Sequence, residues 1–327
     1  MDLAGSLKLA VLAVGLEAFL GYPQGLFRAT GHPVTWAGGL ISLLDARLNR
    51  ESLSSSARRV LGFAAIAILL GAAFFAAWLA GVSIAALNLP QPASLALTAL
   101  IASSLIAQKS LHEHVMEVAC ALDTGLEQGR AAVSKIVGRD VNALDESGVA
   151  SAAIESLAEN FSDGAVAPAF WLALGGLPAG FCYKALNTAD SMIGHRTERH
   201  TAFGFAAAKF DDLANLLPAR LSGLWLVLAA FLVPQASAGE AWRTLRRDAR
   251  KHASPNAGWP EAAAAGALRL RLGGLRSYGG VPFQGAEIGS GRKASASDIR
   301  RALVLYRRAC VIHWGALALA ALAIAQA

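Results

Sequence analysis

The chain has 327 residues, of which 55% are hydrophobic and only 16% are charged, and its mean hydropathy is +0.45. This composition is too apolar for an ordinary soluble domain and contains too many charges for a simple channel bundle. The net charge of +6 comes from basic residues that are split among several stretches and do not alternate with aromatic residues. We therefore expect membrane lipid as a partner and no nucleic acid.

Several apolar runs are long enough to cross a membrane, which takes about 20 residues. The runs that qualify, alone or with their flanks, are 60–82, 93–106, 216–234 and 302–325. Residues 7–20 form a shorter run that includes Glu17 and lacks the charge pattern and cleavage site of a signal peptide. We therefore expect a retained helix there.

The distribution of charge predicts an orientation. Arginine and lysine crowd the stretches 28–59, 109–139 and 243–301, whereas the connector 81–92 has no charge. By the positive-inside rule, the basic stretches face the cytoplasm. We interpret residues 1–327 as a single integral membrane catalytic domain, in which 239–301 is a cytoplasmic segment that contacts substrate and nucleotide.

The expected helices do not alternate simply across the membrane. Residues 152–174 should form one helix, Gly175–Gly180 should break it, and 181–193 should run back. If this hairpin crosses twice and 216–234 crosses once, the most basic stretch lies outside. Either the hairpin or a neighbouring segment must then be re-entrant. The predicted fold is an all-α, polytopic bundle of membrane helices with broken or re-entrant helices and a basic cytoplasmic segment.

Three polar clusters interrupt these apolar helices, and each pairs Asn with Asp at a spacing of three or four. Ionisable groups at membrane depth are costly, so three such clusters in about sixty residues point to one functional site. They are Ile154–Asp163, Asn187–Asp190 and Asp211–Asn215. Pro218 follows the third cluster and should kink the helical run 203–233.

The first cluster has the pattern of a metal site. Glu155, Glu159 and Asp163 are spaced i, i+4 and i+8, so a helix would place them on one face. Their carboxylates repel one another unless a cation lies between them, and Mg²⁺ suits oxygen ligands. We predict that the hairpin brings the first two clusters together around Mg²⁺, with the ligands Asp163, Asp190, Asn160 and Asn187.

Each cluster also has a plainer interpretation. In this interpretation, the first cluster is a solvated helix end, and the second cluster caps a helix near Gly194. In the third, Asp211 and Asp212 are then paired with Lys209 or Arg220. Arg220 nevertheless stands out in an apolar run, and its planar fork suits a carboxylate or phosphate.

The basic segment contains a loop, His252–Glu261, that precedes a predicted helix. Its backbone and Asn256 would approach a phosphate at that helix N-terminus, and the alternative is a plain turn before a helix. Gly273-Gly274 should end the helix. The chain contains no Gly-Lys-Ser/Thr phosphate loop, so any ATP site is of another kind.

Taken in chain order, the motifs resemble those of the adenosylcobinamide-phosphate synthases of cobalamin biosynthesis, the CobD/CbiB family. Leu44-Asp45 departs from the expected pattern, because the family has Glu shortly before the Leu48-Asn49 pair. The matching stretches run nearly end to end: Gly31–Val34, Val137–Asp140, Glu155–Asn160 with Asp163 and Pro168, Tyr183–Met192, Asp211–Asn215 with Pro218–Arg220, Ser254–Gly258, and Leu272–Gly274.

The resemblance implies a multi-pass enzyme of the inner membrane whose active site faces the cytoplasm. ATP and Mg²⁺ would drive an amide bond between the free propionate carboxylate of adenosylcobyric acid and (R)-1-amino-2-propanol or its O-phosphate. Other late enzymes of the corrinoid pathway are candidate partners. The implied catalytic residues are Glu155, Glu159, Asp211 and Asp212. The implied substrate-binding residues are His32, Lys184, Arg220, Asn215, Ser254, Asn256 and Gly258.

Three other functions are compatible with parts of this pattern. A transporter or permease would use the Asn/Asp clusters for ion coupling, but the chain shows no inverted repeat. A membrane prenyltransferase shares the metal chemistry but does not need the Ser254–Gly258 loop. A non-catalytic membrane sensor related to the family would have kept its fold without its activity.

Overall fold

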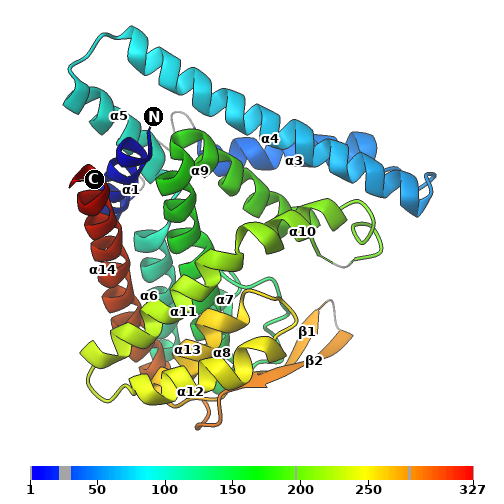
Figure 1. Ribbon diagram of the computed structural model, residues 1–327. Helices are drawn as coiled ribbons and strands as arrows, with labels where there is room; N and C mark the ends of the chain where they lie inside the picture. Colours follow the sequence, from blue (N-terminus) through cyan, green and yellow to red (C-terminus); the bar gives the residue numbers. More distant parts are fainter. Residues whose placement is uncertain (1, 22–30, 196, 279–280, 327) are drawn as a thin grey trace. The chain divides into compact units, whose positions relative to one another are not determined.

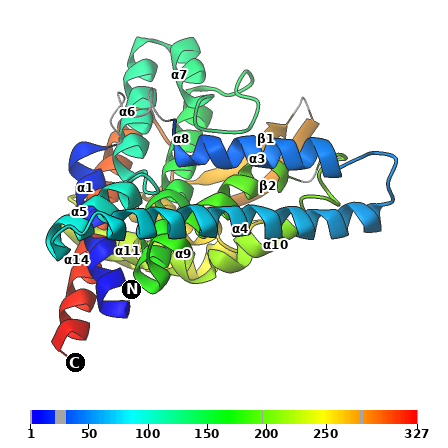
Figure 2. The same ribbon diagram turned by 90° about the horizontal axis from the view of Figure 1, so that it is seen from above.

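The computed structural model describes residues 2–21, 31–195, 197–278 and 281–326 (Figures 1 and 2). Most of these residues are helical, and the strands form one antiparallel hairpin of β1 (Leu272–Tyr278) and β2 (Val281–Ile288). The expectation of an all-α protein is confirmed. The chain divides into two compact units, and each is made of separate stretches of sequence.

The first unit comprises 1–107, 167–215 and 316–327. Its helices are α1 (Leu3–Leu20), α3 (Pro33–Leu48), α4 (Ser55–Ala86), α5 (Gln91–Ser103), α9 (Ala167–Ile193) and α10 (Phe205–Ala214). Helix α1 packs against α5 and α9 through small and aliphatic side chains, including Ala10, Ala13 and Val14. Figure 2 shows α3 running beside α4. Helix α4 exposes large apolar side chains such as Phe74, Phe75 and Trp78, which suits contact with lipid.

The second unit comprises 108–166 and 216–315, and therefore contains the whole predicted cytoplasmic segment 239–301. Its elements are α6 (Gln108–Thr124), α7 (Leu126–Val133), α8 (Glu146–Asn160), the π-helix η1 (Phe161–Val166), α11 (Leu216–Ala229), η2 (Ala230–Leu232), α12 (Ala238–Asp248), η3 (Ala249–Lys251), α13 (Gly258–Leu268) and the β-hairpin. Helix α13 is rich in alanine and almost wholly buried. Gly266 lets it approach α12 closely, since a Cβ there would lie 2.5 Å from the carbonyl oxygen of Glu240. The last helix, α14 (Ala296–Gln326), runs from this unit into the first.

Among the residues that the structure describes, five helices are long and apolar enough to cross a membrane, or six if an interrupted pair counts as one span. The five are Leu3–Leu20, Ser55–Ala86, Gln91–Thr124, Glu146–Ile193 and Ala296–Gln326, and the pair is Phe205–Ala214 with Leu216–Leu232. These helices contain the runs that the sequence predicts as membrane segments, except that the predicted run 216–234 extends two residues past Leu232.

The predicted break at Gly175–Gly180 in the hairpin 152–193 is confirmed and lies at its first two glycines. Gly175 and Gly176 leave the helical conformation, and Gly176 has φ 62°, a value that glycine adopts without strain. Leu172 then packs against Gly180. A straight helix would separate these residues by about 12 Å along its axis. The chain therefore folds back within α9.

Two predicted boundaries are wrong. The run 203–233 is interrupted at Asn215 and not at Pro218. Pro218 instead lies in the first turn of α11, where its missing N–H leaves no helical bond unmade. Helix α13 ends at Leu268, where Arg269 adopts a left-handed conformation, and Gly273-Gly274 belong to β1.

Candidate functional site

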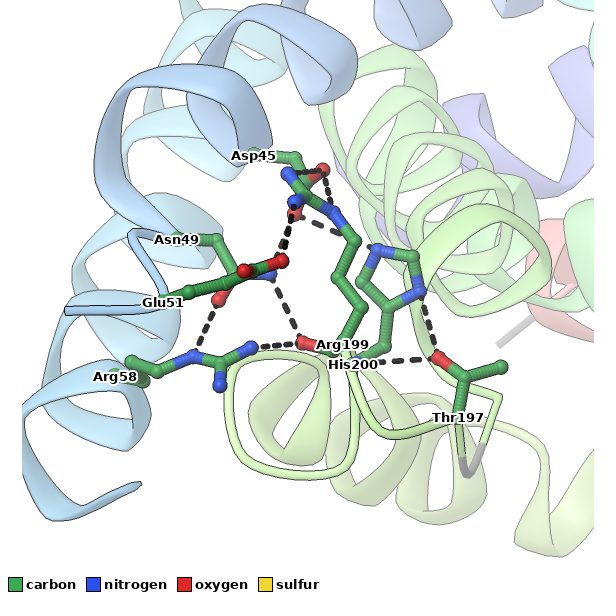
Figure 3. A network of polar contacts seen from close by, with 7 residues as sticks. All are labelled: Asp45, Asn49, Glu51, Arg58, Thr197, Arg199 and His200. Carbon is green, nitrogen blue, oxygen red and sulfur yellow. Dashed lines mark hydrogen bonds and ion pairs between the residues drawn. The ribbon is translucent and has the colours of Figure 1, made fainter. Parts of the chain in front are cut away.

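A polar network in the first unit holds the connection between α9 and α10 in place (Figure 3). Asp45 on α3 accepts hydrogen bonds at Oδ2 from Arg199 Nε and Nη2, at 3.1 and 2.7 Å. Asn49 Nδ2 donates to Asp45 Oδ1 and to the carbonyl oxygen of Arg199. Arg58 on α4 donates to Asn49 Oδ1 and to that same carbonyl. The network ties the connector that precedes α10 to α3 and α4.

The acid–amide cluster, which we define as Asn187, Asp190, Asp211, Asp212 and Asn215, lies on α9 and α10 and at the end of α10. Asp211 Oδ2 accepts a 3.0 Å hydrogen bond from Asn215 Nδ2, and its Oδ1 accepts one of 3.4 Å from Asn187 Nδ2. Asp190 and Asp212 lie near enough to repel the Asp211 carboxylate. The structure thus brings together the second and third predicted clusters.

The members of this cluster differ in how deeply they are buried and in the partners they have. Asp211 and Asn215 are 7% and 1% exposed, and Asn215 Oδ1 also accepts a 2.9 Å hydrogen bond from the Tyr183 hydroxyl. Asp212 makes an ion pair with Lys209 at 3.2 Å, as in the plainer interpretation of the sequence. Asp211 is held by amides and not by a cation.

The second unit contains a polar cavity of about 130 Å³, which we call the glutamate cavity. Its polar lining comes from Glu155, Glu159 and Asn160 on α8, from Arg139 and from Glu261 on α13. Glu159 and Asn160 are exposed, whereas Glu155 and Glu261 are 4% and 1% exposed. The predicted catalytic pair Glu155 and Glu159 therefore lines a real cavity.

Glu155 holds the wall of this cavity together through an ion pair and hydrogen bonds. Its Oε2 accepts a 2.8 Å hydrogen bond from Arg139 Nη2, in an ion pair whose side chains are 6% and 9% exposed. Its Oε1 accepts from Ser151 Oγ and from the backbone N–H of Gly273, at 2.7 and 2.8 Å. In the first cluster, the negative charge of Glu155 is therefore neutralised by the Arg139 guanidinium. The carboxylate that is exposed in the cavity belongs to Glu159.

Asp163 does not share the cavity with Glu155 and Glu159. Helix α8 ends at Asn160 and the chain continues as a π-helix through Phe161–Val166. Asp163 is half-buried and is not one of the residues that line the cavity. The prediction that it shares one helical face with Glu155 and Glu159 stays a prediction.

The residues of the predicted phosphate loop are organised by their own hydrogen bonds. Ser254 Oγ accepts from the N–H groups of Asn256 and Ala257, both at 3.2 Å. Arg220 Nη1 donates a 2.6 Å hydrogen bond to Asn256 Oδ1, which joins Arg220 to this loop. Gly258 packs against η3, where a Cβ would lie 2.1 Å from the carbonyl oxygen of Ala249.

Two further predicted substrate residues lie in the first unit. His32 caps α3, because its Nδ1 accepts a 3.1 Å hydrogen bond from the N–H of Val34. Burial, and then the charge of Lys184, lower the pKa of His32, which keeps Nδ1 an acceptor. Lys184 lines a mainly apolar cavity of about 200 Å³ between α3, α4 and α9.

The predicted Mg²⁺ ligands are divided between the two units. Asn160 and Asp163 belong to the second unit, and Asn187 and Asp190 to the first. In the described parts of the chain, no three His, Cys, Asp or Glu side chains form a group that could hold a metal. The oxygen-only donors of the acid–amide cluster fit Mg²⁺ chemically. The sharing of one ion by Asp163 and Asp190 stays a prediction.

Sequence reasoning missed three side chains of these sites. Arg139 and Glu261 reach the glutamate cavity from outside α8, and Tyr183 holds Asn215. Each belongs to a stretch that the sequence singles out, but no periodicity relates them to their partners, since the contacts join residues 16 to 106 positions apart. A pairing of this kind depends on tertiary structure.

The helices and their buried acids, amides and arginines define the class: a polytopic helical membrane protein with polar sites. The chain belongs to the CobD/CbiB family, because the family model described as CobD/Cbib protein matches residues 10–306. Relatives named cobalamin biosynthesis protein CobD support this. That of Sinorhizobium sp is 48% identical over 313 residues, covering 94% of this chain and 96% of the relative.

Two more of these relatives agree. The CobD protein of Brucella suis biovar 1 is 49% identical over 308 residues, with 92% of this chain and 93% of the relative covered. That of Rhodobacter capsulatus is 45% identical over 304 residues, with 91% and 92% covered. No solved structure matches the chain.

Proposed function

We propose that this protein acts in cobalamin biosynthesis as an ATP-dependent ligase. It would join the free propionate carboxylate of adenosylcobyric acid to (R)-1-amino-2-propanol or its O-phosphate, forming an amide. The observation that carries the proposal is the match to cobalamin biosynthesis proteins at 44–49% identity, which spans more than nine-tenths of the chain.

The reaction requires activation of the acid, because a carboxylate does not condense with an amine at neutral pH. In the proposed sequence, a carboxylate oxygen attacks the γ-phosphorus of ATP, ADP leaves, and an acyl phosphate forms. The amine nitrogen then attacks the acyl carbon, phosphate leaves, and the nitrogen loses a proton. Charge on the transferring phosphoryl group must be balanced by cations and hydrogen-bond donors.

Within this proposal, Glu159 is the best-placed general base. Its carboxylate is exposed in the glutamate cavity, and a base must reach the proton it removes. Both oxygens of Glu155 accept hydrogen bonds from protein donors, so Glu155 positions α8 and Arg139. Mg²⁺, when bound, would neutralise phosphate charge, and the buried Asp211 with its amides offers the ligand chemistry that the ion prefers.

The remaining assignments complete the proposal. Asp212 would act beside Asp211, and His32, Lys184, Asn215 and the Ser254–Gly258 loop would contact substrates. The basic segment 239–301 supports a cytoplasmic active site in the inner membrane, by the positive-inside rule. Lipid would surround the apolar helices, and late corrinoid enzymes would exchange substrates with the protein.

The test is a ligation assay with the purified, detergent-solubilised full chain. Adenosylcobyric acid, the amine, ATP and Mg²⁺ should give a product whose mass is the sum of acid and amine less one water, and ATP should be consumed only when both are present. Product formation without ATP would contradict the proposal. Corrinoid or amine uptake by proteoliposomes, with no new mass, would instead indicate a transporter.

A further inference from the structure

The second unit contains a larger cavity, of about 440 Å³, that is lined by arginine and tryptophan. We call it the arginine cavity. Its walls come from α11, α12, η3 and α13, and its lining residues are Arg220, Leu224, Trp242, Leu245, Arg246, Arg250 and Trp259. Figure 1 shows α12 and α13 (yellow) side by side, in agreement with their extensive contacts.

Close helix packing fixes one wall of the cavity. Gly223 on α11 lies against Leu245 and the backbone of Trp259, because a Cβ there would meet them at 3.0 and 3.2 Å. Arg220, one turn earlier on α11, stacks its guanidinium 4.7 Å from the ring centre of Trp259. The same guanidinium donates to Asn256 Oδ1 and to the carbonyl oxygen of Leu216. Arg220 is therefore held in one orientation.

The basic residues of α12 and η3 fall into two groups. Those outside the cavity are paired: Arg243 with Glu240, and Arg247 and Lys251 with Asp248. Arg246 and Arg250, which line the cavity, form no ion pair or hydrogen bond with any residue that the structure describes. No carboxylate lines the cavity, and Arg250 lies close enough to Arg220 for their charges to repel.

This arrangement selects an anion. Three guanidinium groups that face one space repel one another, and that repulsion is relieved when a negative charge enters. Guanidinium groups match the oxygens of a phosphate in a two-point fork. The indole faces of Trp242 and Trp259 add apolar surface beside the charges, which a simple inorganic ion does not use.

We propose that the arginine cavity binds the phosphate group of an organic phosphate. Two sources supply this chemistry, a soluble phosphate ester such as a nucleotide and the headgroup of an anionic phospholipid. Trp242, which lines the cavity, is exposed and makes the second source possible, since basic pockets and tryptophans between membrane helices receive lipid headgroups. The proposal rests in part on the substrate-binding role proposed for Arg220 and the adjoining loop. It concerns binding alone, and the test substitutes Arg246 and Arg250, so its failure is distinguishable from a failure of the ligation proposal.

The proposal is tested by measuring the binding of two probes to the full chain in uncharged detergent. The first arm titrates ADP, without Mg²⁺, and follows intrinsic tryptophan fluorescence. The second arm adds phosphatidylglycerol or phosphatidylcholine and counts the lipids retained in native mass spectra. Each arm compares wild type with R246Q/R250Q. The matched control R243Q/R271Q removes the same charge from paired, exposed arginines of the same unit.

Wild type should bind ADP, or retain phosphatidylglycerol over phosphatidylcholine. R246Q/R250Q should weaken that binding at least tenfold, and the control less than twofold. A response in the first arm identifies a soluble phosphate ester as the source, and one in the second arm a lipid headgroup. The proposal is overturned if wild type binds neither probe, or if both double variants weaken binding equally, because the effect is then one of net charge.

Discussion

Glu155 and Glu159, the two glutamates that α8 contributes to the glutamate cavity, should respond differently to substitution. Glu155 lies in an ion pair with Arg139 whose side chains are 6% and 9% exposed, and it accepts two more hydrogen bonds. Removing one partner of a buried pair leaves the other charge uncompensated, at a cost of about 3–5 kcal/mol. At about 2 °C per kcal/mol for a chain of this size, E155A should lower Tm by roughly 6–10 °C.

Glu159 supplies the matched control, because it lies one helical turn further along α8, lines the same cavity and is exposed. E159A should change Tm by less than about 1 °C, as expected for a surface substitution, yet reduce ligation by at least about 100-fold, a typical loss for a general base. Thermal unfolding in detergent and the ligation assay measure the two effects. Equal Tm values for E155A and wild type would refute the bracing role of Glu155, and full turnover by E159A would refute its role as base.

Three further predictions concern the other sites. D211N should abolish ligation while the protein still inserts and folds, because the amide keeps the size of the side chain and one of its two acceptor oxygens but removes the buried charge; wild-type turnover would make the cluster structural. N256A should raise the KM for ATP or the amine and leave the Mg²⁺ dependence unchanged, whereas a shift in Mg²⁺ requirement alone would assign the loop to metal. Burial alone would raise the pKa of Asp45, but hydrogen bonds from Asn49 and Arg199 outweigh it and lower the pKa. This stabilisation is complete above the ordinary pKa and disappears as pH falls through the lowered one, so D45N should be less stable than wild type at pH 7, and the difference should shrink as pH falls below the ordinary pKa of Asp. Parallel unfolding curves at all pH values would contradict this.

Local signals predicted the parts of the fold that depend on local physics. The apolar runs determine the long helices, and Gly175-Gly176 break α9 because glycine alone adopts a φ of 62° readily. Proline is a weaker guide, since Pro218 is tolerated in a first helical turn and the interruption lies at Asn215. There, the side chain of Asn215 is bonded to Asp211 and Tyr183.

The sites required tertiary information to a greater degree. The spacing of Glu155 and Glu159 correctly places both at one cavity, but the π-helix that follows them and the absence of Asp163 from the lining have no signature in the sequence. Arg139 and Glu261 come from other segments. In the same way, only packing separates Arg246 and Arg250, which face a cavity, from the paired arginines beside them.

The central claim is that the corrinoid carboxylate is activated by phosphorylation before the amine attacks. Adenosylcobyric acid labelled with ¹⁸O at both oxygens of its free propionate tests this directly, because an acyl phosphate transfers one carboxylate oxygen to phosphate. The proposed mechanism predicts one ¹⁸O in the inorganic phosphate released and one in the amide. Unlabelled inorganic phosphate, or label recovered in AMP, would contradict it.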